Sequence, residues 1–339
     1  MMIILAGLSF LWSASATSAD SYLTDGKKEM LLTAQEHLLN DRFESAHATL
    51  DSLIDRDSSD PVGYLYKAAV YLGQMTDAEQ ELHTETFKAL IDTVFTLASH
   101  RTDSARVREA AWMKLCEGHA HAYRSLWESR FGSFTSALKH AFRGKSSYED
   151  GLRFDSTLYD LYGGLGMYHY WKSAKAGILR WIGVFKNDKE KGIEELYLAA
   201  DSSLLSHDIA RNALIWIWLD MGRYDSVITA CREQMNLFPD GKLFLWPLAQ
   251  AYFEKKQFHL AAETYASLRT RLAELPGNYF NLVECDYRLN RCYDKLDMDE
   301  LAIVTAKRVE NYYDSIPDRT RRKQRSKLNF LRRVAKRTP

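Results

Sequence analysis

Residues that interrupt helices are scarce in this chain. Its 339 residues include only 17 Gly and 6 Pro. These two residues destabilise a helix interior most, so few positions would force a long helix to end. Hydrophobic residues make up 46% of the chain and aromatic residues 12%, which is enough for a continuous buried core. The composition therefore favours a folded, mainly helical protein with aromatic residues in its core.

Cysteine is also scarce, with four residues in the whole chain. Four thiols are too few for a disulfide-built scaffold of this length. Cys285 and Cys292 lie seven residues apart, which is about 10 Å along a helix axis and too far for a bridge within one straight helix. No pair of cysteines has the close spacing of zinc ligands. We expect small buried helix residues here, and neither a metal site nor a cofactor.

The chain has no net charge, but its charge is unevenly distributed. Residues 316–339 contain ten Lys or Arg and one acid, Asp318, so this tail carries +9 and the rest of the chain −9. On a helix the tail would gather Leu328, Leu331 and Val334 on one side and most basic residues on the other. Such a basic amphipathic helix could cover the last open hairpin of a repeat array, which we favour, or contact an anionic membrane surface.

Long apolar runs are confined to the N-terminus. An uncharged run from Ile3 to Trp12 is followed by small residues that include Ala16 and Ala19. This pattern is typical of a cleaved secretory signal, although the basic residues expected before the run are missing. We predict a signal peptide over residues 1–19 and an exported, periplasmic protein. The run is too short to cross a bilayer, and no later stretch is long enough.

Two segments of the C-terminal half repeat each other at an offset of 34 residues. Aligned in this way, large and small apolar residues occupy matching positions. The matched pairs are Trp218 with Tyr252, Tyr224 with Phe258, Val227 with Ala261, and Cys231 with Tyr265. A period of 34 residues built from two helices is that of the tetratricopeptide repeat.

The chain resembles the tetratricopeptide family in the order of its residues around this repeat. In that family a large residue ends the first helix, a turn with Gly follows, and a small residue and a second large residue lie in the next helix. Here these positions are Trp218, Gly222, Tyr224, Val227 and Cys231, with Pro239 closing the unit. Val227 departs from the usual Ala. The resemblance implies an α-solenoid that binds partners and performs no catalysis.

Weaker copies extend the pattern in both directions. Phe43 and Ala46 occupy the same places in the N-terminal part, Pro61 opens another helix, and Gly192 lies in a further copy. We therefore predict an all-α fold with six to eight helical hairpins over residues 20–315. A single hairpin cannot bury its apolar face alone, so the hairpins should stack into a right-handed superhelical solenoid, followed by the basic helix of residues 316–339.

Residues 158–185 do not fit a tight repeat. They combine Gly163, Gly164 and Gly166 with many aromatic residues and an irregular apolar insertion, 178–185. This segment is weakly similar to a divergent tetratricopeptide branch that includes a fungal mitochondrial outer-membrane protein. Aromatic residues are common anchors of binding sites. The partner-binding residues that we predict here are Tyr168, Tyr170, Trp171, Trp181 and Phe185. Burial in the solenoid core is the more common reason for such aromatic residues, but it explains the insertion less well.

Catalytic motifs were not found. His119 and His121 are two residues apart and point in different directions on a helix, so they cannot share a metal. The sequence GGLG lies within a helical pattern, so close helix packing explains it better than phosphate binding. We expect a scaffold of the cell envelope that binds a peptide or protein in its concave groove. The alternative is a lipid or another small apolar ligand near residues 158–185; export argues against nucleic acid.

Overall fold

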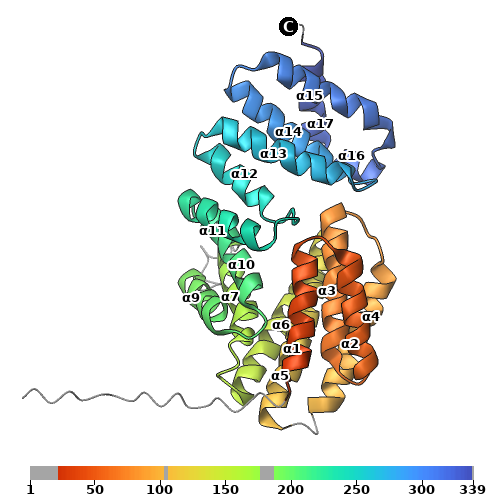
Figure 1. Ribbon diagram of the computed structural model, residues 1–339, viewed down its shortest axis with the longest axis vertical. Coiled ribbons are helices and arrows are strands. Elements are labelled where there is room, and N and C mark those ends of the chain that lie inside the picture. Colours follow the sequence, from red (N-terminus) through yellow and green to blue (C-terminus); the bar gives the residue numbers. More distant parts are fainter. Residues whose placement is uncertain (1–21, 103–105, 176–186, 338–339) are drawn as a thin grey trace, which may run out of the picture.

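The computed structural model describes residues 22–102, 106–175 and 187–337 of the chain (Figure 1). Within these ranges the regular structure is entirely helical, which confirms the predicted all-α class. The first seven helices are α1 (Asp25–Leu39), α2 (Phe43–Arg56), α3 (Pro61–Ala78), α4 (Thr84–Thr102), α5 (Val107–Phe131), α6 (Phe134–Phe154) and α7 (Asp160–Lys175). The next four are α9 (Lys189–Ser202), α10 (His207–Asp220), α11 (Tyr224–Leu237) and α12 (Leu245–Glu254). The last are α13 (Phe258–Ala273), α14 (Tyr279–Lys295), α15 (Asp299–Tyr312), α16 (Asp318–Lys323) and α17 (Arg325–Ala335).

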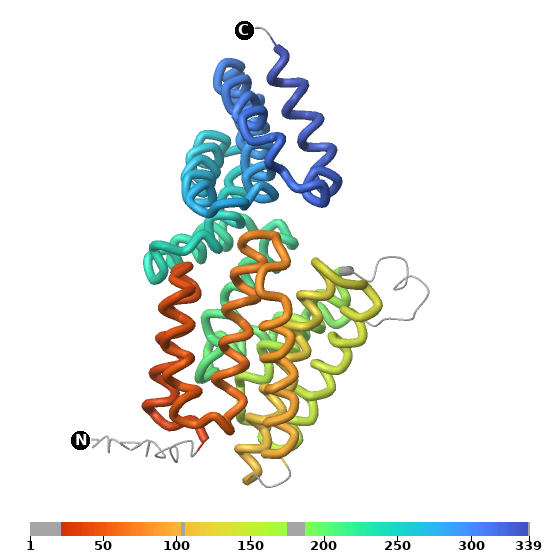
Figure 2. The backbone as a smooth tube through the Cα atoms, turned by 90° about the vertical axis from the view of Figure 1, so that its right-hand side faces the viewer, coloured from red at the N-terminus to blue at the C-terminus, as the bar shows by residue number. Residues whose placement is uncertain are grey.

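Consecutive helices pack against each other along the chain. Helices α12–α17 lie above α1–α4 in Figure 1, and the tube in Figure 2 shows the same succession from red to blue. Four clusters of buried apolar side chains fill the spaces between neighbouring helices. No helix in the described ranges combines the length and hydropathy needed to cross a membrane. The predicted signal peptide and the insertion at 178–185 lie outside the described residues.

Four of the turns between consecutive helices have the same backbone geometry. In each turn one residue has a positive φ: Asp41 (59°), Gly222 (73°), Lys256 (60°) and Asp297 (55°). The amide of the next residue donates a hydrogen bond of 2.8–3.0 Å to the carbonyl oxygen five residues earlier. This is the bond pattern of a Schellman cap, which satisfies the last carbonyls of a helix. The same turn therefore precedes α2, α11, α13 and α15, and Gly222 ends a helix as its sequence context predicts.

The positions matched at the 34-residue offset occupy equivalent places in the structure. Tyr224 and Phe258 are the first residues of α11 and α13, and both are half-buried. Their partners further along these helices are buried: Val227 and Ala261, and also Cys231 and Tyr265, are at most 1% exposed. Ala46 is likewise fully buried in α2, and Phe43 begins that helix.

A second type of turn occurs twice in the N-terminal part, where the sequence showed only weaker copies of the repeat. Asp57 accepts the amide of Ser59 at 3.0 Å, and Asp155 accepts the amide of Thr157 at 2.8 Å. A tyrosine seven residues after each Asp donates its hydroxyl proton to the carbonyl of the residue that follows that Asp. These polar contacts position the starts of α3 and α7.

Contacts between residues about 200 positions apart join the two halves of the chain. The ammonium group of Lys242 lies 2.8 Å from Asp41 and 3.4 Å from Asp77. The side chains of Asn278 and Asn281 donate to the carbonyl oxygen of Asp77 at 2.9 and 2.7 Å. The ends of α1 and α3 are therefore fixed against the loops that surround α12 and α13. No sequence motif indicated these contacts.

The basic tail forms α16 and α17, and its apolar face is covered. Leu328, Leu331 and Val334 are at most 3% exposed and pack with side chains of α14 and α15. This burial agrees with the predicted role of the tail as a cover for the last hairpin. The basic residues Arg322, Arg325 and Arg333 face solvent instead.

Candidate functional site

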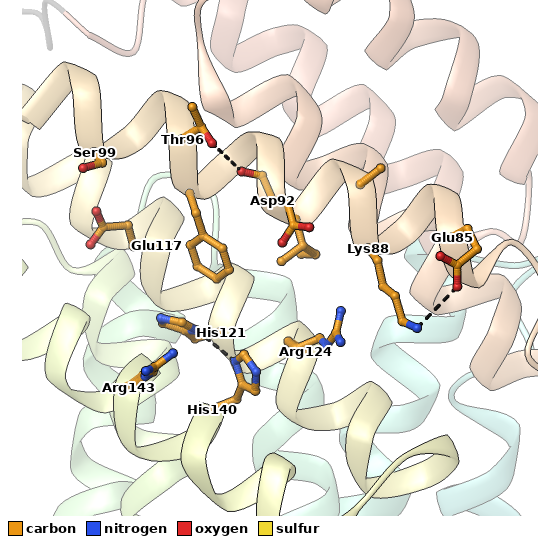
Figure 3. A pocket seen from close by; sticks show the side chains of 13 residues that line it. Glu85, Lys88, Asp92, Thr96, Ser99, Glu117, His121, Arg124, His140 and Arg143 are labelled. Carbon is orange, nitrogen blue, oxygen red and sulfur yellow. Dashed lines mark hydrogen bonds and ion pairs between the residues drawn. The ribbon is translucent and has the colours of Figure 1, made fainter.

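A groove runs between α4 on one side and α5 and α6 on the other (Figure 3). Its volume is about 960 Å³, which is large enough for several residues of a peptide. Glu85, Lys88, Ala89, Ile91, Asp92, Phe95, Thr96 and Ser99 line it from α4, Glu117, His121 and Arg124 from α5, and His140 and Arg143 from α6. The predicted binding residues on α7 are not among them.

The register of α5 and α6 is fixed at the turn between them. The hydroxyl of Ser133 accepts the amide of Ser136 at 3.2 Å and so caps the start of α6. Glu128, near the end of α5, accepts the amide of Ser133 at 3.2 Å. Further along, the Ser125 hydroxyl donates to the carbonyl oxygen of Ala137 at 2.8 Å. In the same antiparallel register, His121 of α5 lies opposite His140 of α6.

His121 and His140 are hydrogen-bonded to each other in the groove. Their Nδ1 atoms are 3.0 Å apart, so one ring donates and the other accepts. Burial, together with the neighbouring His140 and the charge of Arg143, lowers the pKa of His121 to about 4. Burial also lowers the pKa of His140. Phe95 packs against His121 with ring centroids 4.4 Å apart. The pair of His121 and His140 is therefore uncharged at neutral pH.

Two charged groups in the groove have opposite signs and lie on different helices. Asp92 of α4 and Arg143 of α6 are exposed, and neither forms an ion pair within the described ranges of the chain. The other charged lining residues form ion pairs with N···O distances of 2.8–3.4 Å. These pairs are Lys88 with Glu85, Glu117 with Lys114, and Arg124 with Glu128. The groove thus presents an unpaired carboxylate on one wall and an unpaired guanidinium on the other (Figure 3).

The described lining of the groove contains few groups of the kinds used in nucleophilic or metal-assisted catalysis. Nucleophilic catalysis needs a nucleophile hydrogen-bonded to a base that a third group orients. Thr96 and Ser99 are the hydroxyl groups of the lining, and the Thr96 hydroxyl donates to the carbonyl oxygen of Asp92 at 3.0 Å. The described residues contain no cluster of three or more His, Cys, Asp or Glu suited to a metal ion. The lining residues can form hydrogen bonds, charge pairs and apolar contacts.

The predicted binding residues lie on α7 or outside the described residues. Tyr170 is fully buried and its hydroxyl donates to Asp220 at 2.6 Å. Tyr168 and Trp171 are half-buried; the ring centroid of Trp171 lies 5.2 Å from that of Tyr170. Trp181 and Phe185 are not described. The partner-binding role of this segment therefore stays a prediction, and the environment of Tyr170 is that of a core residue.

His119, named in the sequence analysis, and His169 of α7 have structural surroundings. The Nδ1 atom of His119 lies 2.9 Å from the hydroxyl of Tyr148. His169 is 4% exposed, and its Nδ1 atom lies 2.6 Å from a carboxylate oxygen of Glu195. His119 and His121 do not meet, as their spacing predicts. The contact between His121 and His140 was missed, because it depends on where the turn of the α5–α6 hairpin falls.

Known proteins give no further guide to this groove. The sequence matches no protein-family model, and it matches no curated protein. The chemistry of the groove must therefore be derived from its own residues.

Proposed function

We propose that this chain is a non-enzymatic scaffold that binds a peptide segment of a partner protein in the groove lined by α4, α5 and α6. The observation that carries this proposal is the pair of opposite charges, Asp92 and Arg143, on the two walls. A peptide offers amide groups along its whole length and side chains of either charge. A groove with an uncharged middle and one unpaired charge on each wall suits such a ligand.

The surrounding helices belong, in this proposal, to a tetratricopeptide-like α-solenoid with a right-handed superhelical path. Its support is the recurrence of one turn geometry before α2, α11, α13 and α15. The equivalent burial of residues 34 positions apart in α11 and α13 adds to that support. Stacked hairpins of this kind form extended surfaces for partners.

The proposed location is the cell envelope, in the periplasm. Only the sequence of residues 1–19 supports it, through the apolar run and the small residues that follow. The partner would then be a peptide or protein of the same compartment.

The alternative ligand, a lipid or another small apolar molecule near residues 158–185, has less support. Leu158, Leu161 and Leu165 are at most 2% exposed, so the described part of this segment already packs against its neighbours. The groove at α4–α6 offers two exposed, unpaired charges, Asp92 and Arg143.

The experiment that tests the proposal is selection of peptides from an unbiased display library, followed by affinity measurement on charge-reversed variants. We expect Asp92→Lys and Arg143→Glu each to weaken the selected peptides at least tenfold, which corresponds to about 1.4 kcal/mol. Asp55→Lys and Arg333→Glu serve as controls, because both residues are exposed and lie outside the groove. Failure to select any peptide, or equal affinity for groove and control variants, would contradict the proposal.

A further inference from the structure

Helix α6 carries three large apolar side chains on its solvent side. Phe134, Leu138 and Phe142 are 73%, 43% and 48% exposed, and we call them the α6 stripe. Their spacing of four residues places them in one row along the helix. A contiguous row of exposed large apolar residues marks a surface that is covered by something else.

Positive charge accompanies the α6 stripe. Lys139 and Arg143 lie beside it on the exposed side of α6, and neither forms an ion pair in the part of the chain that the structure describes. From Phe134 to Tyr148 the helix contains no Asp or Glu. What covers the α6 stripe must therefore tolerate, or attract, two uncompensated cations.

The basic tail adds further charge at one end of the α6 stripe. The side chains of Arg319 and Lys323 each donate to the carbonyl oxygen of Arg130, at 3.3 Å. The guanidinium of Arg319 also lies 5.6 Å from the ring centroid of Phe131. Arg130 and Phe131 end α5, immediately before the turn that leads to Phe134. Lys323, which forms no ion pair within the described residues, therefore lies near the start of the α6 stripe, whereas the charge of Arg319 is paired with Glu81.

We propose that the α6 stripe docks on an anionic lipid membrane. The rings of Phe134 and Phe142 and the side chain of Leu138 enter the boundary between headgroups and acyl chains. Lys139 and Lys323 contact the phosphate groups. This is the arrangement of an interfacial amphipathic helix, in which apolar burial and electrostatic attraction act together.

The exposed area argues against a second copy of the chain as the occupant. With about 200 Å² for a large apolar side chain, the α6 stripe exposes on the order of 300 Å². A stable protein interface buries about 800 Å² on each partner. In addition, the two uncompensated cations would face their own copies across a symmetric contact. A lipid surface needs no matching shape and supplies the opposite charge.

The structure also selects α6 over α17 as the membrane-contacting helix. The apolar face of α17 is already buried against α14 and α15, so it cannot enter a bilayer without leaving them. The tail can then contribute only its charges, whereas α6 contributes both apolar groups and charge.

The test is co-sedimentation of the full chain with vesicles of phosphatidylglycerol and phosphatidylcholine, against vesicles of phosphatidylcholine alone. Wild type should bind the anionic vesicles and lose binding as salt rises, because exposed charges are screened. Phe134→Ser and Phe142→Ser should each lower the partition coefficient more than tenfold, and Lys139→Glu about fivefold or more. Leu237→Ser and Val304→Ser are matched controls at residues 56% and 53% exposed, and they should bind as wild type does.

Three results would overturn the proposal. The first is wild type that stays in solution with anionic vesicles at low salt. The second is equal loss of binding in the α6 variants and the two controls. The third is binding of an acidic amphipathic peptide that depends on Phe134 while vesicles are not bound, since the occupant would then be a protein. Unchanged circular dichroism shows that each variant is folded.

Discussion

Replacement of Gly166 by Ala tests how closely α7 and α9 approach each other. A Cβ atom at Gly166 would lie 2.6 Å from the carbonyl oxygen of Gly192 and 2.7 Å from Cγ of Leu196. A Cβ atom at Gly192 would lie 2.7 Å from the carbonyl oxygen of Gly166 and 2.7 Å from the amide nitrogen of Tyr170. The closest atoms in both cases include backbone, which cannot rotate away. The helices must therefore separate to accept either methyl group.

Two opposing effects set the magnitude. Alanine in place of glycine improves helix propensity by about 1 kcal/mol. Overpacking of a close contact costs about 1–3 kcal/mol, and separation of α7 from α9 also weakens the packing of Leu196, which is fully buried. The steric effect should win, so we expect Gly166→Ala to lower the free energy of unfolding by roughly 1–2 kcal/mol.

The assay is urea unfolding followed by circular dichroism, with Gly26→Ala as the matched control. Gly26 also lies in a helix, but nothing lies within 4 Å of a Cβ atom there, so this change should be neutral or stabilise by up to about 1 kcal/mol. The double variant with Gly192→Ala should lose less free energy of unfolding than the sum of the two single variants, because each added methyl group forces the same separation of α7 from α9. A Gly166→Ala protein as stable as wild type would refute the close contact of α7 and α9.

Three other changes probe buried groups. Burial raises the pKa of Asp77 to about 6, so the folded state binds this proton more tightly than the unfolded chain does. The free energy of unfolding should therefore fall as pH rises from about 4 to 6. Asp77→Asn should remove that part of the slope in melting temperature against pH, and an unchanged slope would contradict the prediction. His121, with a pKa lowered to about 4, acts in the opposite direction: stability should rise between about pH 4 and 6.5, and His121→Gln should flatten the rise. Leu331 is fully buried in α17, so Leu331→Ala should cost about 2–5 kcal/mol in urea unfolding, and a loss below 1 kcal/mol would show that α17 does not cover α14 and α15.

The sequence predicted helices where periodic apolar residues coincide with turn residues. Gly222 and Tyr224 mark the end of α10 and the start of α11, and Pro61 begins α3 as expected for the first turn of a helix. The packing role of Gly166 was also predicted and is confirmed by its approach to Gly192. These features depend on local chemistry, which a sequence displays directly.

The groove could not be predicted because it depends on contacts between helices. Helices α4, α5 and α6 are 19, 25 and 21 residues long, longer than the 14- and 16-residue helices α11 and α13 of the repeat that guided the alignment, and α4 was not recognised. The Gly132–Ser133 turn was the sequence feature from which the hairpin of α5 and α6 could have been predicted. Antiparallel pairing about that turn would have placed His121 opposite Gly144, about one helical turn from His140. The free charges at Asp92 and Arg143 become evident only after the partners of the other lining residues are known.

The most direct test of peptide binding is photo-crosslinking of a library-selected peptide to a benzoylphenylalanine placed at Ala89. Ala89 is exposed and lines the groove, whereas Ala48 is exposed on α2, outside it. The account predicts that the peptide crosslinks to the chain substituted at Ala89 and not to the chain substituted at Ala48, and that Arg143→Glu abolishes the crosslink. Crosslinking of equal yield at both positions, or at Ala48 alone, would contradict it.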